Sequence, residues 1–265
     1  MRKFYGSILL VAALGLLSAG MAGAWQAYND VVVDNDGVPL PANATRYNIG
    51  NGSPGPSSGL LKNWATGANL GVTATLTQSG GVVYQPGDSA GNPTAGSETN
   101  AGTDAYNLFT SVGVRVKGLV YYGSTGWYVD LAFTGLDSAK SYEFVTTTNR
   151  NGGTSGDYPS RLSTYTISDA DAFTNTSSDG TGAGASTTFC TGHNTVNGYV
   201  ARWAGISPGA DGDFRVRAAN GNPSLNKGYA FSVFRLTEEV IPEPSGFIAL
   251  AMGAAALLGW RRLRK

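Results

Sequence analysis

The chain has 265 residues, of which 18 are Lys or Arg and 18 are Asp or Glu, so its formal net charge is zero. Six of the basic residues lie within the first three and the last five positions, which leaves a net charge of −6 over residues 25–245. This excess of negative charge excludes nucleic-acid-binding proteins, which present basic surfaces. The single Cys and the single His exclude a disulfide scaffold and a zinc site built from Cys and His.

Charged residues make up only 14% of the chain, against roughly 25% in ordinary soluble domains, and there are 38 Gly residues. Low charge combined with abundant Gly, Ser, Thr and Asn is typical of many short strands joined by turns. This composition also favours a protein that works outside the cytoplasm.

Residues 1–24 have the three parts of a secretory signal peptide. Arg2 and Lys3 form a positive start, Ile8–Leu17 is apolar, and Ala22-Gly23-Ala24 places small residues at the −3 and −1 positions. We therefore expect the Sec translocon to export the chain and signal peptidase to cleave it after Ala24. A retained membrane anchor is the alternative, but the apolar run is short for a span.

Between residues 25 and 240, runs of β-branched and aromatic residues recur between Gly, Asn and Asp residues. The clearest is Gly126–Phe133, where Trp127, Val129, Leu131 and Phe133 share one face at a period of two. The expected strands, in chain order, are Tyr28–Val33, Gly71–Thr77, Val112–Lys117, Gly118–Tyr122, Gly126–Phe133, Ser141–Thr148, Arg161–Ile167, Ser186–Thr191, Gly198–Trp203, Asp213–Ala218 and Tyr229–Leu236.

No amphipathic helix of three turns is expected in this region, and Asp169–Phe173 is expected to form one short helical turn. Without crossover helices a parallel sheet is excluded. The sequence therefore predicts an all-β fold, a single β-sandwich domain over residues 25–240, of the jelly-roll kind.

Two segments carry a loose resemblance to secreted β-sandwich modules. Leu131–Arg150, with Thr134-Gly135-Leu136 before Tyr142-Glu143-Phe144, resembles the strand–turn–strand step of fibronectin type III and carbohydrate-binding jelly-roll modules. Lys227–Leu236 is similar to the last strand of such a module. The resemblance implies a fold class only, and the length favours one large jelly roll over a fibronectin-like domain of about 100 residues.

The C-terminal residues 241–265 also have three parts. Pro242-Glu243-Pro244 is followed by Gly246–Trp260, which carries no charge, and by a basic tail at residues 261–265. A helix over residues 246–260 would span about 22 Å, less than the hydrocarbon core of about 30 Å, so it would be a marginal transmembrane anchor. The basic tail would hold the C-terminus in the cytoplasm and leave residues 25–240 on the far side of the membrane.

This order of Pro-Glu-Pro, apolar stretch and terminal Arg cluster resembles the PEP-CTERM sorting signal of Gram-negative bacteria. The resemblance implies that an exosortase, a membrane cysteine transpeptidase, recognises Pro242, Glu243 and Pro244 and cuts the chain near them. It implies transient insertion in the inner membrane, then delivery to the cell surface or to the exopolysaccharide matrix. An ordinary C-terminal membrane anchor is the alternative.

Catalytic residues are not expected. His193 and Cys190 lie close together, but no Gly-x-Ser-x-Gly elbow or positive site that would activate a nucleophile is visible, so we expect a loop histidine and a packed thiol. Asp130 and Glu143 lie on neighbouring expected strands and could meet on one open sheet face, as the two carboxylates of a glycosidase do. The chain is therefore expected not to be an enzyme. Asp130 and Glu143 are the carboxylates that we consider as a possible catalytic pair.

No cofactor is required by the sequence, although one structural calcium ion is an open alternative. Its candidate ligands are the carboxylates of Asp34, Asp36, Asp211 and Asp213, none of which belongs to an EF-hand loop. Such residues otherwise serve as turn formers that bond their own backbone.

A sugar-binding site would need exposed aromatic rings, and the candidates are Tyr121, Tyr122, Tyr128 and Trp203. Three functions follow from these features. The leading one is an exported, non-enzymatic surface or matrix protein associated with exopolysaccharide. A carbohydrate-binding module with a defined glycan site is the alternative, and an extracellular polysaccharide hydrolase is the third.

Overall fold

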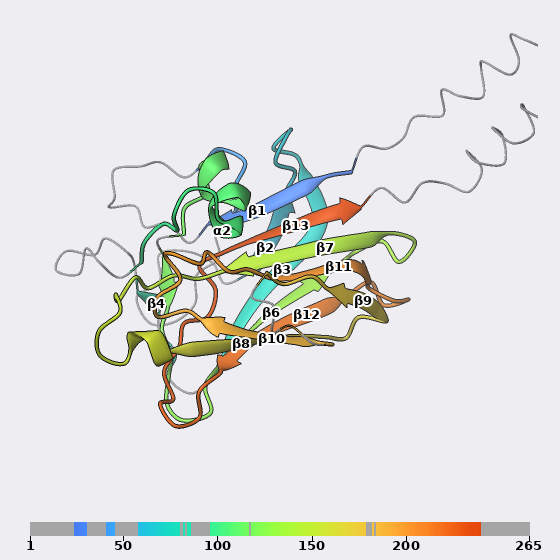
Figure 1. The fold of residues 1–265 in the computed structure, drawn as a ribbon. Helices are drawn as coiled ribbons and strands as arrows, with labels where there is room; N and C mark the ends of the chain where they lie inside the picture. The colour runs from blue at the N-terminus through green and yellow to red at the C-terminus, as the bar shows by residue number, and fades with distance from the viewer. Residues whose placement is uncertain are drawn as a thin grey trace, which may run out of the picture.

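The computed structural model describes residues 24–30, 41–45, 58–79, 82, 84–85, 96–116, 118–178, 182 and 184–239. Within these ranges the chain is mostly strand, and Figure 1 shows the strands arranged in two layers. The expected all-β fold with two sheets is confirmed. The expected signal peptide, Pro-Glu-Pro motif, transmembrane segment and basic tail lie outside the described residues, except for Ala24. Among the described residues there is no helix of a length and hydropathy that would cross a bilayer.

Two antiparallel sheets form the fold. The five-stranded sheet has the order β1 (Gln26–Asp30), β13 (Val233–Glu239), β7 (Ser141–Thr147), β11 (Ala201–Ser207) and β9 (Ala172–Asn175). The six-stranded sheet has the order β10 (Ser186–Cys190), β8 (Leu162–Ser168), β12 (Phe214–Asn220), β6 (Tyr128–Thr134), β3 (Asn69–Gln78) and β2 (Ser58–Lys62). From β6 to β13 each successive strand lies in the other sheet. A separate short pair joins β4 (Tyr84–Gln85) to β5 (Leu119–Val120).

The core lies between the sheets and is built around four phenylalanines. Phe133 and Phe214 come from the six-stranded sheet, whereas Phe144 and Phe234 come from the five-stranded sheet. The ring centroid of Phe133 lies 5.5 Å from that of Phe144, 4.9 Å from that of Phe214 and 5.4 Å from that of Phe234. These tilted and edge-on arrangements are the ones that aromatic quadrupoles favour, so the cluster fixes how the two sheets face each other.

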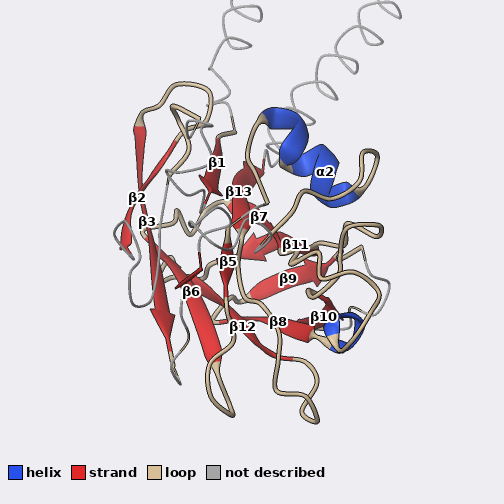
Figure 2. Cartoon of the chain, turned by 90° about the vertical axis from the view of Figure 1, so that its left-hand side faces the viewer, coloured by secondary structure: helices blue, strands red, loops and turns tan. Residues whose placement is uncertain are grey.

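The outer side of the five-stranded sheet is covered by a short helical segment. Helix α2 (Asp104–Leu108) is followed by the 3₁₀ helix η2 (Thr110–Val112). Residues of α2, with Phe109, Val114 and Val116, form a second apolar cluster with β1, β7 and β13. Figure 2 shows α2 beside these strands. The side chain of Thr103 caps α2 by accepting a hydrogen bond from the backbone N–H of Tyr106. Because of this cover, both faces of β7 are largely buried.

Buried amides hold the stretch of chain that leads into the helical segment. Asn149 donates through Nδ2 to the backbone oxygens of Ser97 and Glu98, at 3.1 and 3.3 Å. Asn194 donates its backbone N–H to Oδ1 of Asn149, at 2.9 Å. Both asparagines are fully buried, and a buried amide that lost such partners would destabilise the fold.

Two of the expected elements are wrong. Val112–Lys117 is not a strand: η2 ends at Val112, and Val114 and Val116 are instead buried against the helical segment. Their alternating burial comes from packing against a helix and not from pairing in a sheet. Asp169–Phe173 is not a helical turn, because β9 begins at Ala172 and pairs with β11.

The aromatic core leads to a prediction about stability. We expect Phe133→Ala to lower the free energy of unfolding by about 3–5 kcal/mol, because it removes a buried ring and leaves a cavity between the sheets. Denaturant unfolding of the purified chain measures this loss. Val196→Ala is the control, because Val196 is 62% exposed and its truncation is expected to stay within about 0.5 kcal/mol of the parent. Equal losses in the two variants would contradict the role assigned to Phe133.

Candidate functional site

The outer face of the six-stranded sheet carries the most organised group of polar side chains. Along β6, alternate side chains up to Phe133 face the core. Tyr128 and Asp130, which lie between them in the sequence, therefore face the other side of the sheet. Along β12, Arg215 and Arg217 face the same way. Since Asp130 stands opposite Arg217 in the β6–β12 register, the two charges meet by strand pairing.

The ion pair between Asp130 and Arg217 is bidentate. Nε and Nη2 of Arg217 each donate to one carboxylate oxygen of Asp130, both at 2.7 Å. The same guanidinium lies 4.0 Å from the ring centroid of Tyr128. Its hydrogen bonds to Asp130 raise the pKa of Arg217 above the ordinary value, against a smaller effect of burial. The arginine is therefore held flat between a carboxylate and an aromatic ring.

A second pair continues this group toward one end of the sheet. Nη2 of Arg215 donates to Oδ2 of Asp169 at 2.6 Å, and its Nη1 lies 3.7 Å from Oδ2 of Asp130. Two arginines and two aspartates thus neutralise one another. We call Tyr128, Asp130, Asp169, Arg215 and Arg217 the ion-pair stripe.

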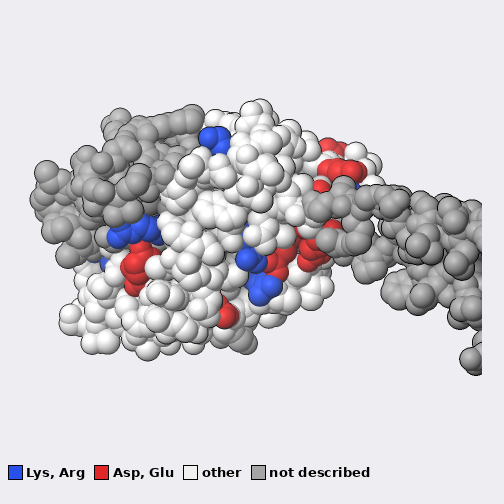
Figure 3. All heavy atoms as spheres, turned by 90° about the horizontal axis from the view of Figure 1, so that it is seen from above, with Lys and Arg blue, Asp and Glu red and all other residues white. Residues whose placement is uncertain are grey.

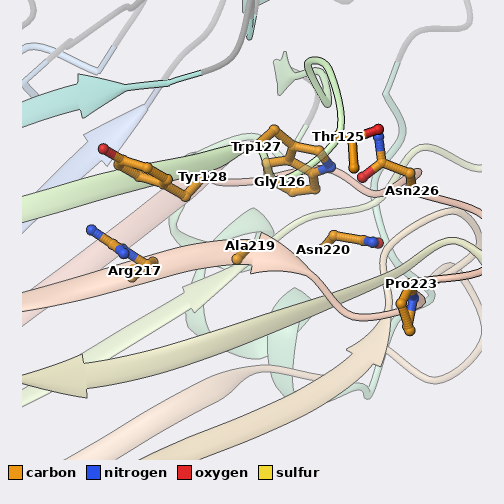
Figure 4. A pocket seen from close by; sticks show the side chains of 9 residues that line it. All are labelled: Thr125, Gly126, Trp127, Tyr128, Arg217, Ala219, Asn220, Pro223 and Asn226. Atoms are coloured by element: carbon orange, nitrogen blue, oxygen red, sulfur yellow. The ribbon is translucent and has the colours of Figure 1, made fainter.

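A hollow of about 370 Å³ opens at the Tyr128 end of the stripe. Trp127, Tyr128, Ala219 and Pro223 form its apolar walls, and the polar side chains that line it are those of Thr125, Arg217, Asn220 and Asn226 (Figure 4). We call it the Trp127 hollow. Its volume falls in the lower part of the range for small-molecule sites, about 300–1,000 Å³.

Trp127 is only 1% exposed, and its indole nitrogen Nε1 has no hydrogen-bond partner among the described residues. An unpaired buried donor costs about 1–3 kcal/mol, so such groups call for an explanation. In Figure 4 the indole nitrogen points toward the side chains of Thr125 and Asn226.

A smaller hollow of about 180 Å³ lies at the other end of the stripe and includes Asp130, Asp169, Asp213 and Arg215. Burial, then the negative charges of Asp211 and Asp169, raise the pKa of the Asp213 carboxyl, while Arg215 opposes this shift. In the part of the chain that the structure describes, no three His, Cys, Asp or Glu side chains are arranged to bind a metal ion. The calcium candidates Asp34 and Asp36 lie outside the described residues.

The four aromatic residues expected to bind a sugar do not lie together in the structure. Trp203 is fully buried and its ring stacks near that of Phe144, so a sugar has no access to it. Tyr121 and Tyr122 belong instead to a cluster around the buried Tyr229, with centroid distances to that ring of 5.1 and 6.2 Å. Of the four candidates, only Tyr128 lies at the Trp127 hollow.

Arg161 holds the Tyr229 cluster together. Its guanidinium donates to the hydroxyl of Tyr229 and to the carboxylate of Asp157, and it lies 4.0 Å from the ring centroid of Tyr158. Burial raises the pKa of the Tyr229 phenol, so this hydroxyl stays protonated. The cluster is packed and internally paired, which indicates a structural role.

The two carboxylates expected as a glycosidase pair do not meet. Asp130 lies on the six-stranded sheet, whereas Glu143 lies on β7 of the five-stranded sheet and pairs with Arg202 and Arg235. Both face away from the core, on opposite sides of a sandwich whose sheets are about 10 Å apart. This arrangement does not provide the separation of about 5–9.5 Å that glycosidases use.

Cys190 and His193 are neighbours in a tight turn. The Cys190 thiol donates to the backbone oxygen of Tyr158 at 3.4 Å. Burial raises the pKa of this thiol, and the backbone N–H groups of His193 and Gly192 only partly oppose the shift. A thiol with a raised pKa has little thiolate near neutral pH and is a poor nucleophile.

The Cys190 geometry predicts slow thiol chemistry. We expect a thiolate-selective reagent to label the folded chain at pH 7 at least about tenfold more slowly than the same chain unfolded in guanidinium, with the rate increasing as pH rises. Absorbance of the released chromophore measures both rates. Cys190→Ala supplies the blank, since this is the only cysteine. Rapid labelling of the folded chain at pH 7 would instead indicate an activated nucleophile.

The Trp127 hollow was not recognisable from the sequence. Asn220 ends β12, Pro223 and Asn226 belong to the loop after it, and the only local signal is the turn-forming run Asn220-Gly221-Asn222-Pro223. Their approach to Trp127 depends on the pairing of β12 with β6, which no local pattern specifies. Comparison with protein-family models, curated proteins and solved structures finds no match for this chain.

Proposed function

We propose that this chain is an exported, non-enzymatic surface or extracellular-matrix protein of a Gram-negative bacterium, which an exosortase sorts through its C-terminal tail. The Sec translocon and signal peptidase would handle the N-terminal residues 1–24. Residues 241–265 would insert transiently in the inner membrane before processing. The body of the protein would then reach the cell surface or the exopolysaccharide matrix.

The observation that carries this proposal is where the two ends of the described fold lie. β1 and β13 are antiparallel neighbours in which Gln26 stands opposite Thr237, and the backbone N–H of Glu238 donates to the oxygen of Trp25 at 2.9 Å. Figure 1 shows the start of β1 beside the end of β13. A signal segment before residue 25 and an anchor after residue 240 would therefore leave the same end of one sheet. Both fit into a single membrane without unfolding the body.

The jelly-roll topology belongs to the same proposal. The strands β1-β13-β7-β11 of one sheet face β6-β12-β8-β10 of the other, and from β6 to β13 successive strands alternate between the sheets. This winding is the one that double-sheet jelly rolls use to join two Greek keys. The β2–β3 pair and β9 extend the two sheets at their edges.

The surface is compatible with a hydrated matrix. Seen from above, it is mostly uncharged, and several of its acidic side chains lie against basic ones (Figure 3). Glu143, for example, accepts hydrogen bonds from both Arg202 and Arg235. Pairs of this kind reduce the number of unpaired charges on the surface.

The sorting proposal predicts the fate of a variant in which Pro242, Glu243 and Pro244 are all replaced by Ala. We expect uncleaved precursor to accumulate in the inner membrane, because the substitution removes the extended, proline-rigidified segment that the enzyme would recognise. Mass spectrometry and fractionation in the native host measure this outcome. Deleting the exosortase of the host is expected to give the same precursor.

The matched control is the double variant Thr154→Ala and Ser155→Ala, which changes an exposed loop of the body. It is expected to be processed like the parent. If the triple-alanine chain has the same mass and location as the parent, residues 241–265 form an ordinary anchor and the sorting proposal fails.

A second function, carbohydrate binding, is favoured by the outer face of the six-stranded sheet. Beside the ion-pair stripe, this face presents hydroxyl groups that bond one another across strands: Ser58 with Thr75, Thr164 with Thr188, and Thr166 with Ser186, at 2.7–2.9 Å. Uncharged hydroxyls next to a hollow with aromatic walls suit a polysaccharide chain better than a charged polymer. A hydrolase is less favoured, because Asp130 and Glu143 lie on opposite sides.

Affinity electrophoresis tests this second function. We expect gels containing a neutral polysaccharide to retard the purified chain, and Tyr128→Ala to reduce that retardation by removing an aromatic wall of the hollow. Tyr121→Ala is the control, because Tyr121 lies in the separate Tyr229 cluster. Mobility that no polysaccharide changes would argue against carbohydrate binding and leave the sorting proposal intact.

A further inference from the structure

The Trp127 hollow combines a buried donor with groups that have spare hydrogen-bonding capacity. Trp127 is 1% exposed and its Nε1 has no partner within the described ranges. An acceptor atom brought into the hollow would complete this hydrogen bond, which a hollow filled only by apolar groups could not do.

The asparagines beside the indole are held by their backbones and keep their amides available. Asn220 uses Oδ1 to accept from the backbone N–H of Asn222 at 3.1 Å, which leaves its Nδ2 group as a donor. Asn226 has a left-handed backbone, with φ at 50°, and its N–H donates to the oxygen of Asn222 at 3.0 Å. No described residue hydrogen-bonds the Asn226 side chain. The hollow thus offers donors and an amide acceptor, held by the end of β12 and the loop after it.

The charges nearby do not favour an anionic ligand. Arg217 is the cation at the hollow, and both its Nε and Nη2 are bonded to Asp130 while its plane covers Tyr128. A carboxylate ligand would have to compete with Asp130 for this guanidinium. The wider region, residues 25–245, carries a net charge of −6, which repels anions further. The chemistry that remains is that of a neutral polyhydroxylated ring.

We propose that the Trp127 hollow is the subsite for one neutral pyranose unit of a polysaccharide. Trp127 Nε1–H donates to one sugar hydroxyl, Asn220 and Asn226 bond neighbouring hydroxyls, and the apolar walls contact the C–H face of the ring. Thr125, which is exposed and has no hydrogen bond to a described side chain, turns aside to admit the ligand oxygen. This inference rests on the second proposed function, carbohydrate binding.

The test uses the full-length chain with ¹⁵N-labelled tryptophan and follows the indole N–H signals by NMR. The probes are D-glucose, D-galactose and D-mannose, with D-glucuronate as the anionic comparison. We expect at least one neutral sugar to shift the Trp127 signal saturably, and glucuronate to bind more weakly. The signal that disappears in Trp127→Phe identifies Trp127.

A matched pair of variants separates the indole donor from general effects of losing a tryptophan. Trp127→Phe is expected to weaken binding of the neutral sugar about tenfold, as loss of one hydrogen bond does. Trp203→Phe is the control, because Trp203 is also fully buried with an unpartnered Nε1 but does not line the hollow. It is expected to leave the affinity unchanged. Asn226→Ala changes a loop side chain and is expected to weaken binding even if Trp127→Phe fails to fold.

Several outcomes would overturn the assignment of a sugar subsite to the Trp127 hollow without deciding against carbohydrate binding or against sorting. If no sugar shifts the Trp127 signal although neutral polysaccharide gels retard the chain, the protein binds carbohydrate elsewhere. The same conclusion follows if Trp127→Phe and Asn226→Ala both bind like the parent. Tighter binding of glucuronate than of any neutral sugar would overturn the assignment of a neutral ligand. None of these results bears on processing at Pro242-Glu243-Pro244.

Discussion

The ring contact between Phe133 and Phe144 is the constraint on which the rest of the fold depends. The two residues lie on strands that follow each other in the chain but belong to different sheets, and their centroids are 5.5 Å apart. This contact fixes which side chains of β6 face the core. Because side chains alternate along a strand, Tyr128 and Asp130 must then lie on the outer face. Trp127, at the start of the same row of inward-facing side chains, becomes one wall of the hollow. The candidate ligand site is therefore a direct continuation of the core.

The sequence predicted what depends on local alternation and missed what depends on pairing. The period of two correctly assigned the faces of residues 126–133. It could not show that Asp130 and Glu143 lie in different sheets, because sheet membership is set by distant partners. Trp203 was misplaced because it was expected at the end of a strand, near a loop, whereas β11 continues past it to Ser207 and its ordinary alternation turns Ala201 and Trp203 inward. The asparagines of the hollow come from the end of β12 and the loop after it, whose position follows from the pairing of β12.

Many of the charged side chains of this protein form ion pairs with one another. Asp130, Glu143 and Asp157 each contact two basic side chains. Apart from the contact of Asp157 with Arg161, which lies four residues further on, these contacts join strands or loops that are distant in the sequence. Asp130 and Glu143 are themselves buried, so losing their basic partners would leave a buried charge unpaired, and the pairs also specify register and orientation. They also remove free charge from the surface. The body of the protein thus combines few charged residues with a paired arrangement of several of them.

The position of β13 has a consequence for the timing of folding. It is the last described strand, yet it lies inside its sheet, between β1 and β7, and β1 has no other strand partner in that sheet. Residues 26 and 237 must therefore meet across nearly the whole chain, a contact that forms slowly because of the long loop it closes. If the chain is exported as proposed, the five-stranded sheet stays open until residues 233–239 have crossed the membrane. Completion of the fold and arrival of residues 241–265 at the bilayer would then coincide, so that only a fully translocated chain could present a finished body to the processing enzyme.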